Sequence, residues 1–135
     1  MNASQKEAWF NLAVVLSVLA IMAIMVPFLG KGALGGFGFL GLLGFSPIFF
    51  RKRQGAVVLD ERDAQIRLRS QFCGHLVVWL LFVVAAVTTP VVYGWDGSVP
   101  VALVMMSVFC GMMVLYMVSS VATLIQYGRG GRDAI

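Results

Sequence analysis

Charged residues are scarce in this sequence. They account for 12% of its 135 residues, while 60% of the residues are hydrophobic. A soluble domain carries about 25% charged residues, so a water-exposed surface of ordinary composition is excluded. The hydrophobic residues gather in runs of about 18 or more, which is the length that an α-helix needs to cross the hydrocarbon of a bilayer. The composition therefore predicts a single integral membrane domain over residues 1–135.

Ionisable side chains are missing from these runs as well. We expect transmembrane helices at about 8–29, 33–50, 72–92 and 99–126, and none of them contains Asp, Glu, Lys or Arg. Enzymes and proton-coupled transporters in membranes usually need such groups inside the bilayer. The lone histidine, His75, cannot form a two-histidine haem site. The sequence therefore predicts an all-α polytopic membrane protein, with four transmembrane helices in two antiparallel hairpins and no catalytic, cofactor or metal site.

Cysteine occurs only twice. Counting along the expected helices at about 1.5 Å per residue separates the depths of Cys73 and Cys110 by more than about 10 Å. That distance is too long for a disulfide, so we expect two free thiols. Cys110 belongs to a stripe with Met106, Met113 and Met117, of which the last two resemble the paired methionines of high-affinity copper transporters. Thioethers suit Cu(I), but core packing is the simpler interpretation.

Positive charge is concentrated in the one long polar segment, residues 51–71. This segment carries six of the ten basic residues and three of the six acidic ones. Lys and Arg accumulate on the cytoplasmic side of membrane proteins, so the segment and both termini are expected to be cytoplasmic. The net charge of +4 is too small and too localised to indicate a nucleic-acid partner. Basic residues beside membrane spans instead contact anionic lipid.

The second half of this segment carries the signals of a helix start. Asp60 is a suitable N-cap, and Asp63 and Arg67 are four residues apart and can pair. We expect a helix that begins at Asp60 and continues without a break into the third span, with Ile66 and Leu68 as apolar contacts for a docked partner. The residues expected to contact a partner or anionic lipid are Arg51, Lys52, Arg53, Asp60, Glu61, Arg62, Asp63, Ile66, Arg67 and Arg69.

The run DERD at residues 60–63, followed by Ile66 and Arg67 and leading into a membrane span, resembles a known family. Small prokaryotic membrane proteins of the DUF2178 type carry a similar D-E-R-D loop between hairpins. The likeness covers this motif and the four-span layout, and it implies a membrane fold without an established activity. Three acids near three arginines could bind a cation, but helix capping and ion pairing are the simpler explanation.

Six polar residues fall at a similar depth near the cytoplasmic face when the spans are counted at about 1.5 Å per residue. Interhelical hydrogen bonds among such residues hold membrane bundles together. We therefore expect a structural polar layer in which His75 contacts at least one of the others, and a ligand or ion vestibule is the alternative. The six residues are Asn11, Ser46, His75, Ser119, Ser120 and Thr123.

Glycine recurs every third residue in the second span. A spacing of three advances about 300° on an α-helix, so these glycines are expected to wind around the helix and not to form one face. Gly32 and Gly36 have the small-xxx-small spacing that lets helices approach closely, and Ser107 and Gly111 form a matching patch in the fourth span. We expect these four residues at helix contacts, with one patch available for a homodimer.

These features together predict a non-enzymatic interaction, anchoring or regulatory subunit. Its cytoplasmic segment, residues 51–71, would dock a soluble or membrane protein while the basic cluster touches anionic lipid. The alternative is a subunit of a small oligomeric transporter or channel.

Overall fold

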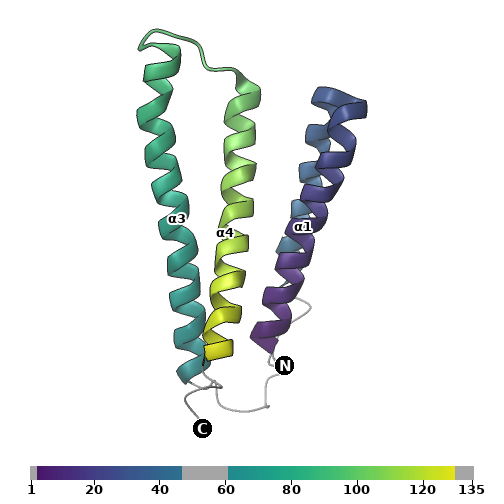
Figure 1. Ribbon diagram of the computed structural model, residues 1–135, viewed down its shortest axis with the longest axis vertical. Helices are drawn as coiled ribbons and strands as arrows, with labels where there is room; N and C mark the ends of the chain where they lie inside the picture. Colours follow the sequence, from purple (N-terminus) through teal and green to yellow (C-terminus); the bar gives the residue numbers. More distant parts are fainter. Residues whose placement is uncertain (1–2, 47–60, 130–135) are drawn as a thin grey trace.

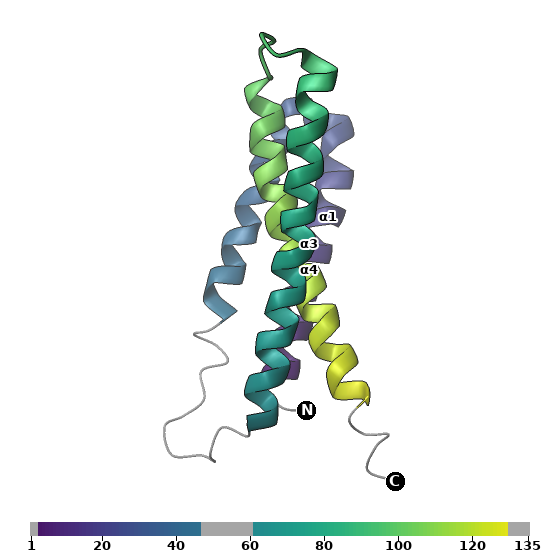
Figure 2. The same cartoon turned by 90° about the vertical axis from the view of Figure 1, so that its left-hand side faces the viewer.

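The computed structural model describes residues 3–46 and 61–129, and this part of the chain is almost entirely helical. Its elements in chain order are α1 (Ala3–Leu29), η1 (Gly30–Phe45), α3 (Glu61–Tyr93) and α4 (Val101–Arg129). Figures 1 and 2 show two hairpins side by side, α1 with η1 and α3 with α4. The expected all-α class is confirmed. Outside the described residues lie the end of the expected second span and Arg51, Lys52, Arg53 and Asp60.

A proline followed by a glycine ends the first helix of each hairpin. Pro27 lies in the last turn of α1, and Gly30 follows with a φ of 50°. In α3, Pro90 is followed by Gly94 with a φ of 76°, and the Gly94 N–H donates a 2.9 Å hydrogen bond to the Pro90 carbonyl oxygen. A positive φ is accessible to glycine but strained for other residues. These two glycines therefore determine where each hairpin turns.

η1 is a 3-10 helix of 16 residues, although runs longer than about four residues are uncommon in this conformation. Its sequence repeats every three residues, and a 3-10 helix has about 3.0 residues per turn. Residues three apart therefore share one face. The expectation that the glycines wind around the helix is wrong, because a spacing of three is one full turn here. The glycines form a single exposed stripe: Gly32, Gly35, Gly38, Gly41 and Gly44.

One large residue of each triplet forms the inward face of η1. Phe37, Leu40 and Leu43 follow one another on it and are buried against α1 and α4. The Phe37 ring stacks on Phe109 of α4, with ring centroids 4.7 Å apart and planes 4° from parallel. The remaining position of each triplet, occupied by Phe39, Leu42 and Phe45, is about half exposed, so the repeat gives η1 one buried apolar face, one exposed apolar face and the glycine stripe.

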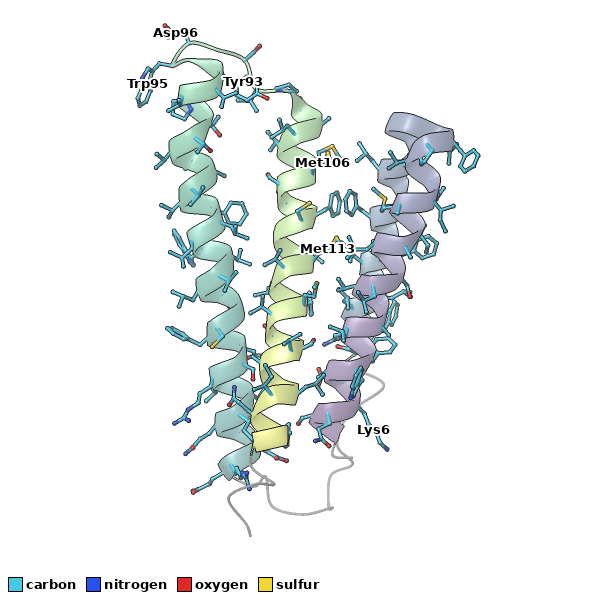
Figure 3. All side chains as sticks on the ribbon, in the orientation of Figure 1. Lys6, Tyr93, Trp95, Asp96, Met106 and Met113 are labelled. Carbon is cyan, nitrogen blue, oxygen red and sulfur yellow. The ribbon has the colours of Figure 1, made fainter. Side chains whose placement is uncertain are left out.

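The two hairpins meet where α1 packs against α4, while η1 packs on α1 and α3 packs on α4. Val15 and Val18 of α1 are completely buried at the centre of this interface. Met113 of α4 belongs to the same core cluster. The expected methionine stripe is thereby divided, because Met106 and Met117 are exposed. Figure 3 shows Met106 and Met113 on the side of α4 that faces α1.

Two of the four small residues expected at tight contacts lie at such contacts. A Cβ atom added to Gly36 would approach the Met22 sulfur of α1 to 2.8 Å, and one added to Gly111 would meet an α3 side chain at 3.4 Å. Gly32 belongs to the exposed stripe, and the Ser107 hydroxyl donates to a carbonyl of its own helix at 2.7 Å. The Gly36 contact lies within the first hairpin, and the Gly111 contact lies within the second.

The outer surface is apolar over most of its length. Three helices in the described part are long and apolar enough to cross a membrane: Ser4–Leu29, Glu61–Tyr93 and Val101–Gly128, with Gly32–Phe45 as a shorter apolar helix. Large side chains such as Phe28, Trp79 and Val91 are strongly exposed. A continuous apolar surface of this kind marks contact with lipid. Cys73 and Cys110 are free thiols, as expected.

Candidate functional site

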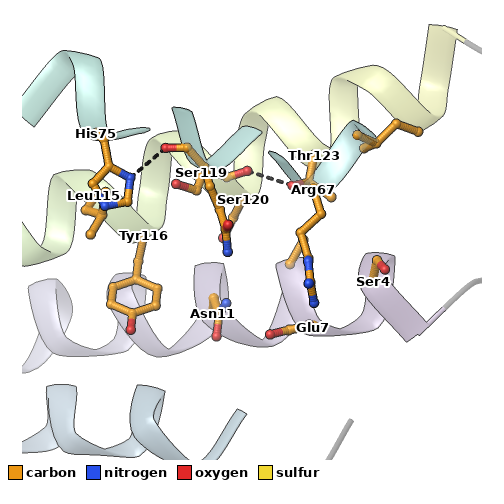
Figure 4. A pocket seen from close by; sticks show the side chains of 13 residues that line it. Ser4, Glu7, Asn11, Arg67, His75, Leu115, Tyr116, Ser119, Ser120 and Thr123 are labelled. Carbon is orange, nitrogen blue, oxygen red and sulfur yellow. Dashed lines mark hydrogen bonds between the residues drawn. The ribbon is translucent and has the colours of Figure 1, made fainter. Parts of the chain in front are cut away.

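A cavity of about 240 Å³ lies between α1, α3 and α4, at the end of the bundle where α1 and α3 begin and α4 ends. Figure 4 shows its side chains converging from the three helices. The apolar part of its wall comes from Ala8, Ile66 and Leu115. The polar part consists of Ser4, Glu7, Asn11, Arg67, Gln71, His75, Tyr116, Ser119, Ser120 and Thr123.

Helical spacing explains why these residues share one space. Glu7 and Asn11 are four residues apart on α1, and Arg67, Gln71 and His75 follow one another at intervals of four on α3. Residues three or four apart lie on the same face of an α-helix. Each helix therefore presents one polar stripe to the cavity. The lining residues of α4, between Leu115 and Thr123, are spaced in the same way.

Gly74 brings α3 and α4 together beside the cavity. A Cβ atom at this position would overlap the Ser119 hydroxyl oxygen and lie 3.0 Å from the Leu115 carbonyl oxygen. Any side chain here would push the helices apart and widen the space next to His75. The sequence interpretation missed Gly74, and the available signal was that it is the only glycine in α3.

Two hydrogen bonds at the cavity wall run within single helices. His75 Nδ1 lies 2.8 Å from the Gln71 carbonyl oxygen, and the Thr123 hydroxyl donates to the Ser119 carbonyl oxygen at 2.8 Å. A carbonyl oxygen can only accept, so His75 Nδ1 is the donor, and Nε2 of the neutral ring remains an acceptor. The structure brings five of the six expected polar residues to this cavity. Ser46, the sixth, is buried elsewhere.

Asn11 is the most enclosed charged or amide side chain of the cavity wall, with 9% of its surface exposed. Its Oδ1 atom has no hydrogen-bond partner in the part of the chain that the structure describes. A buried polar atom without a partner costs about 1–3 kcal/mol. The arrangement around Asn11 is therefore one that an additional hydrogen-bonding group would stabilise.

A second set of polar contacts joins α3 to α4 outside the cavity. The Tyr127 hydroxyl donates a 2.7 Å hydrogen bond to Asp63 Oδ1, and Gln126 Nε2 donates a 3.1 Å hydrogen bond to Ser70 Oγ. These bonds link the first three turns of α3 to the last turns of α4. The sequence interpretation did not identify Ser70, Gln126 or Tyr127, because none belongs to a local motif.

Some of the expected docking residues are exposed in the structure, and others are buried. α3 begins at Glu61 and continues without a break to Tyr93, as expected, and the two acidic residues of its first turn favour that start. Ile66 is only 7% exposed, so the expectation that it offers an apolar contact to a partner is wrong. It packs at the cavity, because it lies on the inward face of α3. Glu61, Arg62, Arg67 and Arg69 are exposed, and Asp63 is half-buried.

Arg67 lies at the cavity, where its side chain extends toward Glu7 of α1 (Figure 4). The expected pairing of Arg67 with Asp63 is not seen among the described residues, and Asp63 accepts the bond from Tyr127. Within the same ranges, no group of three or more His, Cys, Asp or Glu side chains could hold a metal ion. The cavity is therefore a mixed-charge, hydroxyl-rich site.

Comparison with known proteins gives one match. The family model described as "Predicted membrane protein (DUF2178)" matches residues 6–124, which covers most of each of the four helices and every cavity-lining residue except Ser4. No curated protein and no solved structure matches the chain.

Proposed function

The chain belongs to the DUF2178 family of predicted membrane proteins, and from that premise we propose that it is a non-enzymatic anchoring or regulatory subunit with four membrane spans. Residues 61–71 of α3, called the arm from here on, would dock a partner protein at the cytoplasmic face of a prokaryotic inner membrane. The observation that carries this proposal is the rigid attachment of the arm to α4.

The length of η1 supports the count of four spans. A 3-10 helix rises about 2.0 Å per residue, so the 16 residues of η1 extend over roughly 32 Å. This equals the hydrocarbon thickness of a bilayer, about 30 Å. η1 therefore has the reach of a full span despite its small number of residues.

The charge distribution supports the orientation. The first turn of α1, the start of α3 and the end of α4 lie at the same end of the molecule, and the Trp95 and Asp96 turn lies at the other (Figures 1 and 3). Lys6, Arg62, Arg67 and Arg69 are all at the first end. Since Lys and Arg accumulate on the cytoplasmic side, the arm and both termini are cytoplasmic in this proposal.

The arm combines rigidity with an outward face. The bonds from Gln126 and Tyr127 hold it against α4. The arm would therefore lose little conformational entropy when a partner binds it. Leu68 is 65% exposed, and Arg69 beside it is also exposed. A partner that fits this face carries an apolar contact flanked by acidic groups.

The transporter or channel alternative receives less support from the apolar half of the bundle. The hydroxyls of Ser17, Thr88, Thr89 and Ser107 all donate to carbonyl oxygens of their own helices. A hydroxyl that is satisfied in this way contributes little to a polar path across the membrane.

The docking proposal is tested with the double variant Leu68→Glu and Arg69→Glu. Crosslinking in native membranes, followed by purification, should recover a stoichiometric partner with the wild-type chain and lose it with the variant. Lys6→Glu is the matched control, since it reverses an exposed charge at the same end of the molecule on a different helix. An identical set of crosslinked proteins from wild type and double variant would refute docking by the arm.

A further inference from the structure

The cavity between α1, α3 and α4 holds one acidic and one basic side chain at its mouth. Glu7 of α1 and Arg67 of α3 both line it, and no ion pair joins them within residues 3–46 and 61–129. Glu7 is half-buried and Arg67 is exposed. Two opposite charges that line one cavity without pairing with each other can bind the two ends of a molecule that carries both signs.

Asn11 provides the group next to this charged mouth. It lies one helical turn from Glu7 on the same face of α1, it is nine-tenths buried, and its Oδ1 has no partner among the described residues. Rotation about the last torsion of the Asn11 side chain can offer either the oxygen or the NH₂ group to a ligand. The oxygen is suited to an ammonium N–H, and Glu7 supplies the negative charge beside it.

The rest of the wall is consistent with a small polar ligand. Ser119 and Ser120 add hydroxyls, and His75 adds an imidazole ring whose Nδ1 atom lies 2.8 Å from the Gln71 carbonyl oxygen. A volume of about 240 Å³ is equivalent to roughly eight water molecules at about 30 Å³ each. It is at the small end of ligand pockets, which start at about 300 Å³. The site therefore suits a molecule of a few heavy atoms.

We propose that this cavity binds a small zwitterion that carries a primary ammonium group and an oxyanion. The ammonium group lies between Glu7 and the Asn11 side-chain oxygen, and the oxyanion binds the Arg67 guanidinium. Guanidinium groups bind carboxylates and phosphates in two-pronged geometry. This site is distinct from the outward face of the arm, because Leu68 and Arg69 do not line the cavity.

Two sources can supply this chemistry. A free amino acid has an ammonium and a carboxylate group, and an ethanolamine lipid headgroup has an ammonium and a phosphate group. The cavity lies at the end of the spans, where lipid headgroups are also found, so both can reach it. The experiment therefore tests each source separately.

Thermal unfolding in lipid nanodiscs tests the proposal, because a ligand that binds only the folded state raises the melting temperature. The first series adds L-alanine to phosphatidylcholine nanodiscs, and it also adds the half-molecules ethylammonium and acetate, each of which carries only one of the two charges. The second series replaces part of the phosphatidylcholine with phosphatidylethanolamine. At least one of the two zwitterions should raise the melting temperature, and each half-molecule should bind about tenfold more weakly or worse. A response to the lipid alone identifies the headgroup as the ligand.

Three variants make the test specific. Asn11→Leu and Arg67→Gln should each abolish the zwitterion response, whereas Arg69→Gln, two residues away on the outward face, should keep it. Asn11→Leu also removes an unpartnered buried oxygen, so the empty protein should melt at the wild-type temperature or above. If neither L-alanine nor phosphatidylethanolamine raises the wild-type melting temperature, or if Arg67→Gln responds like wild type, the cavity is only water-filled and the proposal is wrong.

Discussion

The hydroxyl of Tyr127 donates a 2.7 Å hydrogen bond to Asp63 Oδ1, which joins the last turns of α4 to the first turn of α3. The two residues are 64 positions apart in the chain. Together with the bond from Gln126 to Ser70, it holds the polar ends of the second hairpin together. These two hydrogen bonds hold the arm against α4.

Tyr127→Phe removes this bond and keeps the ring. A hydrogen bond to a carboxylate contributes about 1.5–3 kcal/mol, and partial solvent access reduces that value, so the loss should be about 1–2 kcal/mol. Denaturant unfolding in detergent measures it. Tyr93→Phe at the opposite end of the molecule is the control, and equal stability losses in the two variants would mean that the Tyr127 hydroxyl has no special role.

Gly74→Ala should loosen the contact between α3 and α4. The added Cβ atom would overlap the Ser119 hydroxyl and crowd the Leu115 carbonyl oxygen, and overpacking of this kind costs about 1–3 kcal/mol. Gly128→Ala is the control, because no atom of residues 3–46 and 61–129 lies within 4 Å of its added Cβ. Alanine favours the helix there, so this variant should gain up to about 1 kcal/mol. A Gly74→Ala protein as stable as wild type would show that the helices do not approach closely at this point.

Two glycines of η1 should respond differently to the same substitution. Gly36→Leu places a large side chain against Met22 of α1 and should lower the unfolding free energy by about 1–3 kcal/mol. Gly38→Leu, only two residues away, points its side chain into open space and should keep the contact with α1. Melting temperature and detergent-solubilised size report both effects. The opposite order of stabilities would contradict the 3-10 register of η1.

The proposed topology predicts a one-sided labelling pattern. In a background with Cys73 and Cys110 replaced by serine, cysteine introduced at Ser98 should react with an impermeant maleimide on intact cells. Cysteine introduced at Gln65, which is exposed on the arm, should react only after the cells are opened, because the excess of Lys and Arg holds that end in the cytoplasm. Labelling of position 65 on intact cells would reverse the assigned orientation.

The positions of the helices were predictable from the sequence because crossing a bilayer is a local property. A segment must satisfy its own backbone hydrogen bonds and present apolar side chains over a fixed length. Both requirements can be recognised in one continuous stretch of sequence. The conformation of η1 was not predicted. Its period of three was visible, but it was interpreted on an α-helix, which is far more common than a long 3-10 helix.

The sequence predicted the depth of the cavity residues along their helices, but not the direction in which each side chain points. Counting residues placed His75 and Ser119 at one depth, and the structure brings both to the same cavity. Depth does not specify the direction in which a side chain points around its helix. For that reason Ser46 was included although it lies elsewhere, and Glu7 was not recognised as a lining residue.

The sequence by itself determined the helical class, the three long apolar helices, the turns at Gly30 and Gly94, and the charged end of the molecule. Only the tertiary structure decided that Ile66 faces inward while Leu68, two residues later, faces outward. The reason is physical. In lipid, apolar residues are favourable on every side of a helix, so hydrophobicity does not identify the inward face. That choice depends on close packing between helices that are distant in the chain, such as the approach of Gly74 to Ser119.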